Sequence, residues 1–265
     1  MTTADRRTGA GAPDQVAAAA VRCWILREDP GLAEAVDPEL RAQAQDALVA
    51  RELRIGPGPW NERPAQTDDS VGLLVLDGVI LHRVGIGDRF GVELVGAGDL
   101  LRTPDPWPDG PLAVASEWVV LERARIAVLD GRFSRRLSAF PEVAVRLFRR
   151  TTQRSHRLAV NMAIVQQARV DVRLQLLLWH LAGRFGRVRP DGVLVSLKLT
   201  HAVLADLVAA RRPTVTTALA SLREQGLVHA TDDGWLLSGR PPAHPAPAAV
   251  MPAPPRRRQG PHREP

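Results

Sequence analysis

Cysteine is almost missing from this chain of 265 residues, in which Cys23 stands alone. One thiol cannot form an internal disulfide, and it cannot by itself hold an iron–sulfur cluster or a structural zinc ion. His82, His156 and His180 show no ligand spacing either. We therefore expect no metal site and no cofactor, and we interpret Cys23 as a small buried apolar residue.

Long apolar runs are also missing. No stretch approaches the roughly 18 uninterrupted apolar residues of a membrane-spanning helix, and the first 15 residues lack the apolar centre of a signal peptide. The sequence therefore predicts a cytoplasmic protein without a membrane partner.

Enzyme motifs are not found: the sequence has no HExxH, no Walker glycine loop, no GxSxG elbow and no cluster of DNA-cleaving carboxylates. What is present is a globular composition, with 45% hydrophobic residues and enough length for one large or two ordinary domains. We expect a protein that is not an enzyme.

Charge is unevenly distributed along the chain, whose formal net charge is +6. Residues 1–131 carry 13 arginines against 21 acidic residues, a net charge of −8, whereas residues 132–189 carry 13 arginines against two acidic residues, a net charge of +11. Residues 190–239 carry a net charge of −1. The basic middle of the chain is therefore the part expected to help attract phosphates.

The end of the chain, residues 240–265, sets Arg256, Arg257 and Arg258 among prolines and alanines and carries a net charge of +4. This composition predicts a disordered tail, as does the polar composition of residues 1–15. The basic tail could add sequence-independent affinity for DNA, or it could be a solubilising extension without a defined role.

Two short amphipathic segments lie within LTHAVLADLVAARRPTVTTALASLREQGLV, residues 199–228. Thr200 is positioned to cap a first helix, whose apolar stripe is Leu204, Leu207 and Val208. A pair of alanines follows and lets two backbones approach closely. The pattern predicts a short helix followed by a tight turn.

A second apolar stripe, formed by Val215, Leu219 and Leu222, has the i, i+4, i+7 spacing of a helix. Pro213 stands in the first turn, where its missing N–H costs no helix bond, and Gly226 stands where a helix C-terminus favours glycine. These signals predict a second helix.

The predicted second helix, over about residues 212–225, has a polar edge of arginine and threonine opposite its apolar stripe. Such groups can bond phosphates or base edges when the helix lies in a major groove, and arginine recognises guanine best. A hairpin over residues 227–237, turning at Thr231–Gly234, would make the module winged. Together these features predict a winged helix-turn-helix whose partner is double-stranded DNA. The alternative is plain packing of two antiparallel helices, which occurs in many unrelated domains.

Between about residues 68 and 130 the pattern changes to short strands with Asp and Gly turns, which is typical of a β-roll or barrel. Before them, residues 16–55 show helical patterns broken near Pro30 and Pro38. The predicted strands, with a turn at Asp77-Gly78, are Val71–Leu76, Val79–Val84, Arg89–Val95, Ala113–Val120 and Arg125–Leu129.

Residues 135–186 show helical patterns, with Pro141 near a helix start and a break at about Ala168–Asp171. A narrow seam with steps of three and four runs along the first of these helices, and arginines occupy other positions. Such a seam is typical of a parallel dimer, in which each chain buries it against its twin; the alternative is that it packs on its own β domain. The predicted dimer interface is Phe148, Thr151, Ser155, Leu158, Met162 and Val165.

With a β-roll, a long helix, a break and a winged helix-turn-helix in this order, the chain resembles the superfamily of bacterial transcription regulators that includes the cyclic-AMP receptor protein and the fumarate-nitrate regulator (CRP/FNR). The resemblance covers most of residues 40–239. It is carried by Gly72–Gly78 with Glu93–Leu101, by Arg173–Leu181 and, most specifically, by Leu199–Val228.

The resemblance implies an α+β fold with an N-terminal, cyclic-nucleotide-binding-like β-roll as sensor, a long dimerisation helix and a C-terminal winged helix-turn-helix. In this sequence the sections are a tail at 1–15, the sensor domain at 16–134, the dimerisation helix at 135–168, the DNA-binding domain at 169–239 and the basic tail at 240–265.

By position, Arg212 falls on the guanine-reading arginine of the family, Thr217 on a second base-contacting position, and Thr200, His201 and Thr214 on phosphate-contacting positions. Pro213 stands where many members have a base-reading glutamate, and Thr217 where they often have arginine, so we expect a different operator. The predicted DNA-binding residues are Thr200, His201, Arg211, Arg212, Thr214, Thr216 and Thr217.

A cyclic-nucleotide pocket needs a Gly-Glu pair for the ribose hydroxyl and an Arg-Ser-Ala or Arg-Thr-Ala run for the cyclic phosphate. Here Arg102-Thr103 takes the place of the pair and Ala113-Val114-Ala115 the place of the run, with a proline-rich insert at residues 104–108 between them. We therefore expect weak or absent binding of cyclic AMP.

Arg102 is the remaining candidate for binding another anion, although a lone loop arginine is more often solvated or ion-paired. Trp60, Trp107 and Trp118 could line an apolar effector cavity, although tryptophans on a β-roll usually belong to the core.

Three functions remain open at this point. The first is a homodimeric, sequence-specific regulator whose sensor biases two recognition helices through the long helices and a hinge near Val170. The second is a ligand-independent architectural DNA-binding protein, and the third is an enzyme-associated nucleotide sensor that does not touch DNA. For the first, the resemblance implies RNA polymerase and an unidentified small-molecule effector as further partners.

Overall fold

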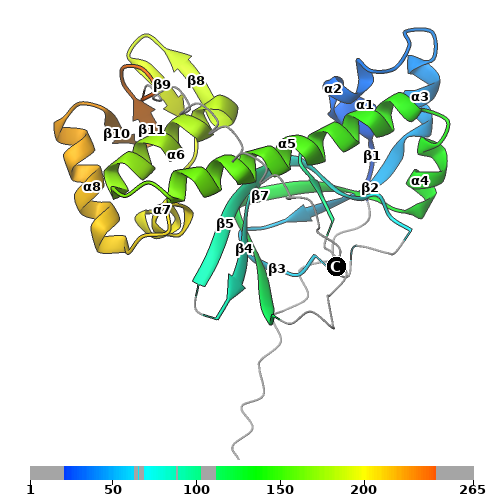
Figure 1. Cartoon of the computed structure of the whole chain (residues 1–265). Coiled ribbons are helices and arrows are strands. Elements are labelled where there is room, and N and C mark those ends of the chain that lie inside the picture. The colour runs from blue at the N-terminus through cyan, green and yellow to red at the C-terminus, as the bar shows by residue number, and fades with distance from the viewer. Residues whose placement is uncertain (1–20, 63–64, 66–68, 88, 103–111, 243–265) are drawn as a thin grey trace, which may run out of the picture.

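The computed structural model describes residues 21–62, 65, 69–87, 89–102 and 112–242. The predicted tail at 1–15, the proline-rich insert with Trp107 and nearly all of the predicted basic tail lie outside these residues. The described chain is an α+β molecule in which an antiparallel sheet and a helix-turn-helix lobe are joined by one long helix (Figure 1).

Short helices and two strands begin the described chain. The helices are broken near Pro30 and Pro38 as predicted, and Asp29 caps the second helix by accepting a hydrogen bond from the backbone N–H of Leu32. The helical interpretation of residues 16–55 is wrong at both flanks, where two strands pair antiparallel because cross-strand packing outweighs local propensity. The elements are β1 (Val21–Trp24), α1 (Ile25–Glu28), α2 (Pro30–Ala33), α3 (Arg41–Ala47) and β2 (Val49–Ile55).

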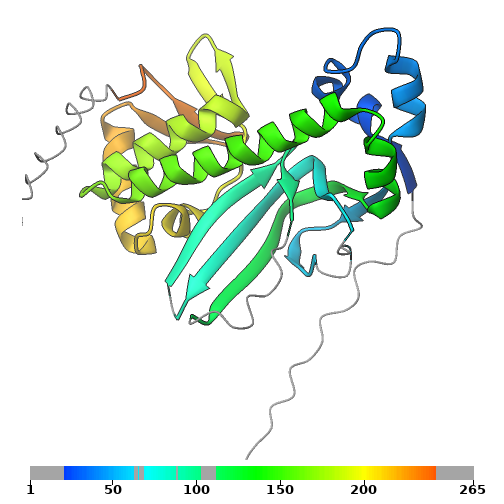
Figure 2. The same ribbon diagram turned by 45° about the vertical axis from the view of Figure 1, so that its right-hand side comes forward.

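The roll is one antiparallel sheet in which the strand order is β1-β2-β7-β4-β5, with β3 paired to β7 and β6 to β4. Figure 2 shows its long strands side by side beneath the long helix. The remaining strands are β3 (Gly58–Trp60), β4 (Gly72–Ile86), β5 (Arg89–Gly96), β6 (Leu100–Leu101) and β7 (Val114–Leu129).

Two pairs of predicted strands are in fact two continuous strands, β4 and β7, so the predicted turn at Asp77-Gly78 is wrong. The register of β4 against β7 shifts around Asp77, which makes this site a β-bulge. Gly78 has a φ of 91°, and a Cβ there would lie 2.5 Å from the carbonyl oxygen of Arg123. Glycine therefore lets two long strands bend while they remain paired.

Three helices follow the roll: α4 (Gly131–Leu137), α5 (Pro141–Val165) and α6 (Val170–Phe185). α5 begins with the predicted proline at its first position and crosses the roll from α1–α3 to the helix-turn-helix lobe (Figure 1). α5 ends at Val165 and α6 begins at Val170, so the chain breaks between them, a few residues earlier than the predicted break at about Ala168–Asp171. α6 then folds back along α5, so that Arg157 of α5 and Arg184 of α6 meet at Asp99.

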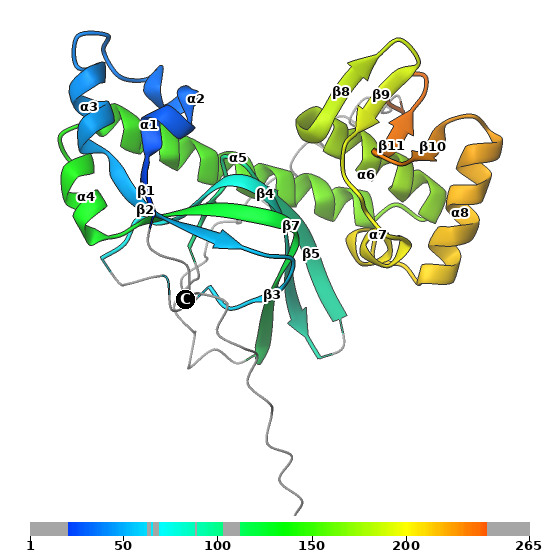
Figure 3. The ribbon, with the colours of Figure 1, turned by 180° about the vertical axis from the view of Figure 1, so that it is seen from behind.

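The lobe, residues 170–237, combines α6 with two further helices and a sheet of order β10-β11-β9-β8 (Figure 3). The predicted hairpin is β10–β11, whereas the hairpin β8–β9 was not predicted. The turn sequence Pro190-Asp191-Gly192 could have revealed it, since this composition is typical of turns and Gly192 has a φ of 148°. The elements are β8 (Gly186–Arg189), β9 (Gly192–Val195), α7 (His201–Leu207), α8 (Arg212–Glu224), β10 (Val228–Thr231) and β11 (Gly234–Leu237).

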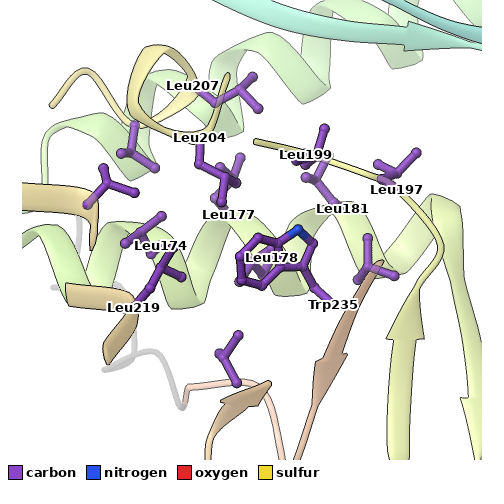
Figure 4. Close-up of a cluster of buried hydrophobic side chains, with 14 of the residues drawn as sticks. Leu174, Leu177, Leu178, Leu181, Leu197, Leu199, Leu204, Leu207, Leu219 and Trp235 are labelled. Atoms are coloured by element: carbon purple, nitrogen blue, oxygen red, sulfur yellow. The ribbon is translucent and has the colours of Figure 1, made fainter. Parts of the chain in front are cut away.

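A continuous apolar core fills the lobe and reaches the roll. Four buried leucines of α6 form its centre, and α7, α8 and Trp235 pack around them (Figure 4). The same cluster includes Val79, Leu81 and Val92 of β4 and β5. The lobe is therefore docked on the roll through apolar contact as well as through the chain. The four leucines are Leu174, Leu177, Leu178 and Leu181.

Candidate nucleic-acid interface

Thr200 caps α7, as predicted: its Oγ1 accepts a hydrogen bond of 3.3 Å from the backbone N–H of Val203. One side of α7 is fixed by burial, since Leu204 and Leu207 are 0% and 2% exposed. With only seven residues, α7 depends on this packing more than on its own propensity.

The turn between α7 and α8 is tight. Ala209 has a φ of 50°, which is uncommon for a residue with a Cβ, and Ala210 donates its N–H to the carbonyl oxygen of Ala205 at 2.9 Å. Arg173 of α6 donates to the carbonyl oxygens of Val208 and Ala209 at 3.1 and 3.3 Å. The arginine thus satisfies carbonyls that the end of α7 leaves free, and it ties the turn to α6.

α8 matches its prediction to within one residue at its end. Val215, Leu219 and Leu222 are buried in the lobe core, and Pro213 lies in the first turn. Gly226 follows the helix with a φ of 70°, the left-handed conformation expected just after a helix.

The opposite side of α8 is exposed, and we call Arg211, Arg212, Thr214, Thr216 and Thr217 the recognition edge. All five were predicted from the sequence. Neither arginine forms an ion pair or a side-chain hydrogen bond with any described residue. Their guanidinium groups therefore remain available to an external acceptor.

Two of the threonines are oriented by their own helix. The hydroxyl of Thr216 donates to the carbonyl oxygen of Arg212 at 3.1 Å, and that of Thr217 donates to Pro213 at 3.3 Å. We expected both hydroxyls to bond phosphates or base edges. In this arrangement their hydrogens are used within the helix, so their oxygens present lone pairs and act as acceptors. His201 Nδ1 lies 2.9 Å from Thr216 Oγ1, which links the start of α7 to the recognition edge.

The basic middle of the chain supplies less free charge than its composition suggests. Arg154 pairs with Glu93 of β5, and Arg157 and Arg184 both pair with Asp99. Arginines of the +11 segment thus neutralise acids of the −8 segment where α5 and α6 meet the roll. The phosphate attraction predicted from this segment is reduced accordingly.

The predicted seam of α5 is only partly covered by its own chain. Phe148, Met162 and Leu158 are 72%, 69% and 37% exposed, and Ser155 is exposed, whereas Thr151 and Val165 are half-buried. The side of α5 that packs on its own chain adjoins the seam, because five of the six seam residues, all but Phe148, also line a cavity between α5 and the roll. The buried residues of α5 are Val143, Leu147 and Ile164.

A cavity of about 750 Å³ lies where β4, β5 and β7 meet α5 and α7. Trp118 lines this cavity, and Trp60 packs edge-on against Trp118 with ring centroids 6.2 Å apart. Arg102 also lines the cavity and donates to the carbonyl oxygen of Ser70. The predicted anion-binding candidate is therefore a bonded residue of the cavity wall.

Glu93 is the most perturbed acid of this cavity. Burial raises its pKa, but hydrogen bonds from His82 and Arg154 outweigh burial and lower it to about 2. His82 Nδ1 lies 2.8 Å from Glu93 Oε1, and the His82 ring stacks on Trp118 with centroids 3.8 Å apart. The wall of the cavity thus contains an ionised carboxylate that is already neutralised.

Among the described residues, no three His, Cys, Asp or Glu side chains are grouped as a metal ion would require. Cys23 is buried, and burial is the main cause that raises the pKa of its thiol to about 11. In the same part of the chain, no helix combines the length and apolar character needed to cross a membrane.

Comparison with known proteins agrees with this geometry. Residues 172–238 match the Crp-like helix-turn-helix domain. The chain is 38% identical over 73 residues to the global nitrogen regulator of Synechococcus elongatus, covering 27% of this chain and 33% of that protein. It is 37% identical over 76 residues to that of Synechocystis sp., covering 28% and 34%. The chain therefore spans about a third of the length of the curated relatives it matches.

Solved structures extend the likeness to the whole fold. A cyclic nucleotide-binding domain containing protein from Listeria monocytogenes EGD-e has a TM-score of 0.58 at 13% identity, covering 78% of this chain and 96% of that one. A CooA mutant from Carboxydothermus hydrogenoformans has a TM-score of 0.56 at 16% identity, covering 86% and 92%. A transcriptional regulator of the CRP family from Thermus thermophilus has a TM-score of 0.50 at 19% identity, covering 70% and 91%. The resemblance predicted from the sequence is confirmed: the C-terminal domain is Crp-like, and the chain has the fold of CRP/FNR proteins.

Proposed function

We propose that the protein is a homodimeric, sequence-specific DNA-binding regulator of transcription and not an enzyme. The observation that carries the proposal is the recognition edge, a row of exposed arginines and threonines on a helix whose opposite side is buried. A helix held this way can enter a major groove with its first residues against the bases. The match to Crp-like helix-turn-helix domains supports the same role.

Within this proposal Arg212 bonds a guanine, because a guanidinium matches the two acceptors that guanine shows in the major groove. Thr217 contacts a second base, and Thr200, His201 and Thr214 contact phosphates. The hydrogen bond between His201 and Thr216 supports this assignment of base contacts and phosphate contacts, since it keeps the start of α7 beside the recognition edge.

The exposed side of α5 supports the dimer. Phe148 and Met162 are large apolar residues left in solvent on a helix of 25 residues. A second chain related by a two-fold axis would cover both copies of this side and hold two recognition helices about 34 Å apart, one turn of DNA. In this proposal the dimer interface consists of Phe148, Thr151, Ser155, Leu158, Met162 and Val165.

Cyclic AMP is an unsuitable effector for the roll in this proposal. Arg154 could face a cyclic phosphate from the cavity wall, but it is bonded to Glu93 through two of its nitrogens. A phosphate would have to compete with that carboxylate. We expect calorimetric titration with cyclic AMP to give no stoichiometric response at micromolar concentration, and such a response would contradict this part of the proposal.

Selection of bound duplexes from random DNA tests the proposal as a whole. A two-fold-symmetric motif should be enriched, and its affinity at physiological salt should exceed that of random DNA by about 1,000-fold or more. Equal affinity for both, with a steep salt dependence, would instead indicate the ligand-independent architectural binder. Absence of binding to every duplex would leave a sensor that does not touch DNA. RNA polymerase and a small-molecule effector are the further partners of the proposed regulator.

A further inference from the structure

We infer that Asp99 of the roll is a positioning residue for the lobe: its carboxylate joins the roll to α5 and to α6 at one point, and thereby fixes the angle at which the lobe sits. The inference that Asp99 fixes this angle stands on the contacts of the folded chain. The inference that the angle matters for DNA rests on the proposed function.

Asp99 lies in the turn between β5 and β6 and is 3% exposed. The turn itself orients its carboxylate, because the backbone N–H of Gly96 donates to Asp99 Oδ2 at 3.1 Å. Gly98, with a φ of 85°, gives the backbone the left-handed conformation that this tight turn uses. The carboxylate is therefore a fixed part of the roll.

Two guanidinium groups from different helices meet this carboxylate. Arg157 of α5 donates to Oδ1, and Arg184, in the last turn of α6, donates to Oδ2 at 2.6 Å. Charge-assisted hydrogen bonds of this kind are short and directional. A single buried acid thus touches the roll, the long helix and the lobe together.

Arg184 is itself held at several points. Its Nη2 donates to the carbonyl oxygen of Ala97 at 2.8 Å, and its guanidinium lies 5.0 Å from the centre of the Phe185 ring. An added Cβ at Gly96 would lie 3.0 Å from the Phe185 ring, so the end of α6 is seated directly on the turn. Because α6 carries the central leucines of the lobe, this seat orients the whole lobe (Figure 4).

The other contacts between lobe and roll are less suited to fix an angle. The apolar contact of the lobe core with β4 and β5 stabilises docking, but the hydrophobic effect is non-directional. Asp206 of α7 lies 3.7 Å from Arg83 of β4, with side chains 40% and 28% exposed, and such solvent-accessible pairs contribute little. The bonds of Arg184 to the β5–β6 turn are therefore the ones that specify orientation.

Asp99→Asn separates the charge from the turn. The amide oxygen of asparagine can still accept the N–H of Gly96, so the turn keeps its own bond. The guanidinium groups of Arg157 and Arg184 are then left close together without the carboxylate, and like charges repel. We expect the lobe to remain folded and to lose its fixed angle.

The angle is measured by the distance between two spin labels in one chain. Cys23 is buried, with a raised thiol pKa, so it should not react with the label. Ala42→Cys on α3 and Glu224→Cys on α8 provide exposed labelling sites in roll and lobe. Labelled chains diluted with unlabelled chains should show one narrow distance distribution. Asp99→Asn should broaden it about twofold or more, and an unchanged width would overturn the inference.

Asp29→Asn is the matched control. Asp29 also accepts a backbone N–H and binds an arginine of α5, Arg150, but it is bonded to no residue of the lobe. This variant should leave the width unchanged, and equal broadening in both variants would reduce Asp99 to a general contribution to stability. Arg184→Gln breaks the contact from the lobe side and should broaden the distribution even if Asp99→Asn fails to fold. Arg184→Lys keeps the charge and should recover part of the narrow distribution; a lobe left fixed by Arg184→Gln would also overturn the inference.

DNA with varied half-site spacing tests whether the angle matters. In a dimer the lobe angle sets which spacing both recognition helices can reach. The unaltered chain should prefer one spacing over spacings one base pair longer or shorter by about tenfold or more. Asp99→Asn should lower this preference to about threefold or less, with the same base preference in each half-site.

The outcomes of the two measurements are distinguishable. A broadened distance distribution with an unchanged spacing preference would show that Asp99 fixes an angle on which DNA choice does not depend. Loss of base preference within each half-site would mean that the variant damages the lobe itself, which contradicts a positioning role. Broadening in a chain that binds no DNA would reject the proposed function and leave the role of Asp99 in docking intact.

Discussion

Two helices of this molecule, α5 and α8, each bury one side and leave the other uncovered, and the two uncovered sides have opposite chemistry. α8 exposes arginine and threonine, whereas α5 exposes Phe148, Met162 and Leu158. Buried leucine and valine hold both helices in place. The difference therefore lies only in what each helix offers to a partner.

The two unpaired arginines at the start of α8, Arg211 and Arg212, favour a partner rich in acceptors, such as the bases and phosphates of DNA. Exposed aromatic and thioether side chains on α5 favour a partner that removes them from water, such as a second copy of the same helix. The proposed function thus gives one chain two interfaces, and we expect that each can be disabled without the other.

Phe148→Asp should have the largest effect. A two-fold axis would place two copies of the new charge in one apolar interface, so the dimer dissociation constant should rise about 1,000-fold, roughly 4 kcal/mol. Sedimentation velocity over a concentration series measures it. Gln153→Asp, on an exposed α5 position outside the predicted seam, should leave the dimer unchanged. If Phe148→Asp leaves the dimer intact, another surface joins the chains.

Acid should loosen the inner side of α5 with the next largest effect. The pKa of Glu93 falls from an ordinary 4.5 to about 2 in the folded chain. A lowered folded pKa stabilises the fold above pH 4.5, and this contribution, up to about 3 kcal/mol, is lost as the pH falls from about 4.5 through about 2. Denaturant unfolding at several pH values measures it.

Glu93→Gln is the control for this titration, because it cannot ionise. The difference in unfolding free energy between the unaltered chain and Glu93→Gln should shrink across that pH window. A difference that stays constant down to pH 2 would show that the pair with Arg154 does not stabilise the fold.

Arg212→Ala tests the exposed side of α8. Loss of a bidentate contact should cost about 1–3 kcal/mol on the selected operator and relax the preference at one base pair. The dimer should survive, because α8 and α5 act separately. Arg223→Ala, an exposed arginine in the last turn of the same helix, should cost less and leave the preference intact. Equal losses on operator and random DNA would assign Arg212 to a phosphate.

The exposed sides of α5 and α8 were predictable from the sequence because both depend on local periodicity. Val215, Leu219 and Leu222 fix the buried side of α8, and Pro213 and Gly226 fix its ends. The same argument places Phe148 on a seam. Neither inference requires the position of any other part of the chain.

The long strands and the charge pairing were not predictable in this way. Gly78 has the composition of a turn, but it forms a bulge because β7 continues alongside both halves of β4. In the sequence, Arg154 and Arg157 contribute to the net positive charge of residues 132–189. In the structure, they form ion pairs with Glu93 and Asp99. These features depend on contacts between residues far apart in the sequence, which periodicity does not report.

Thr200→Ala should have the smallest effect and is the finest test of the comparison. Loss of the cap on α7 should destabilise the lobe by about 1 kcal/mol, and loss of a phosphate contact should weaken binding to all DNA sequences by a similar factor. Thr200→Ser keeps a capping hydroxyl and should recover most of both losses. Because α5 lies outside these contacts, the dimer dissociation constant should not change. A change in sequence preference would mean that α7, and not α8 alone, positions the recognition edge against the bases.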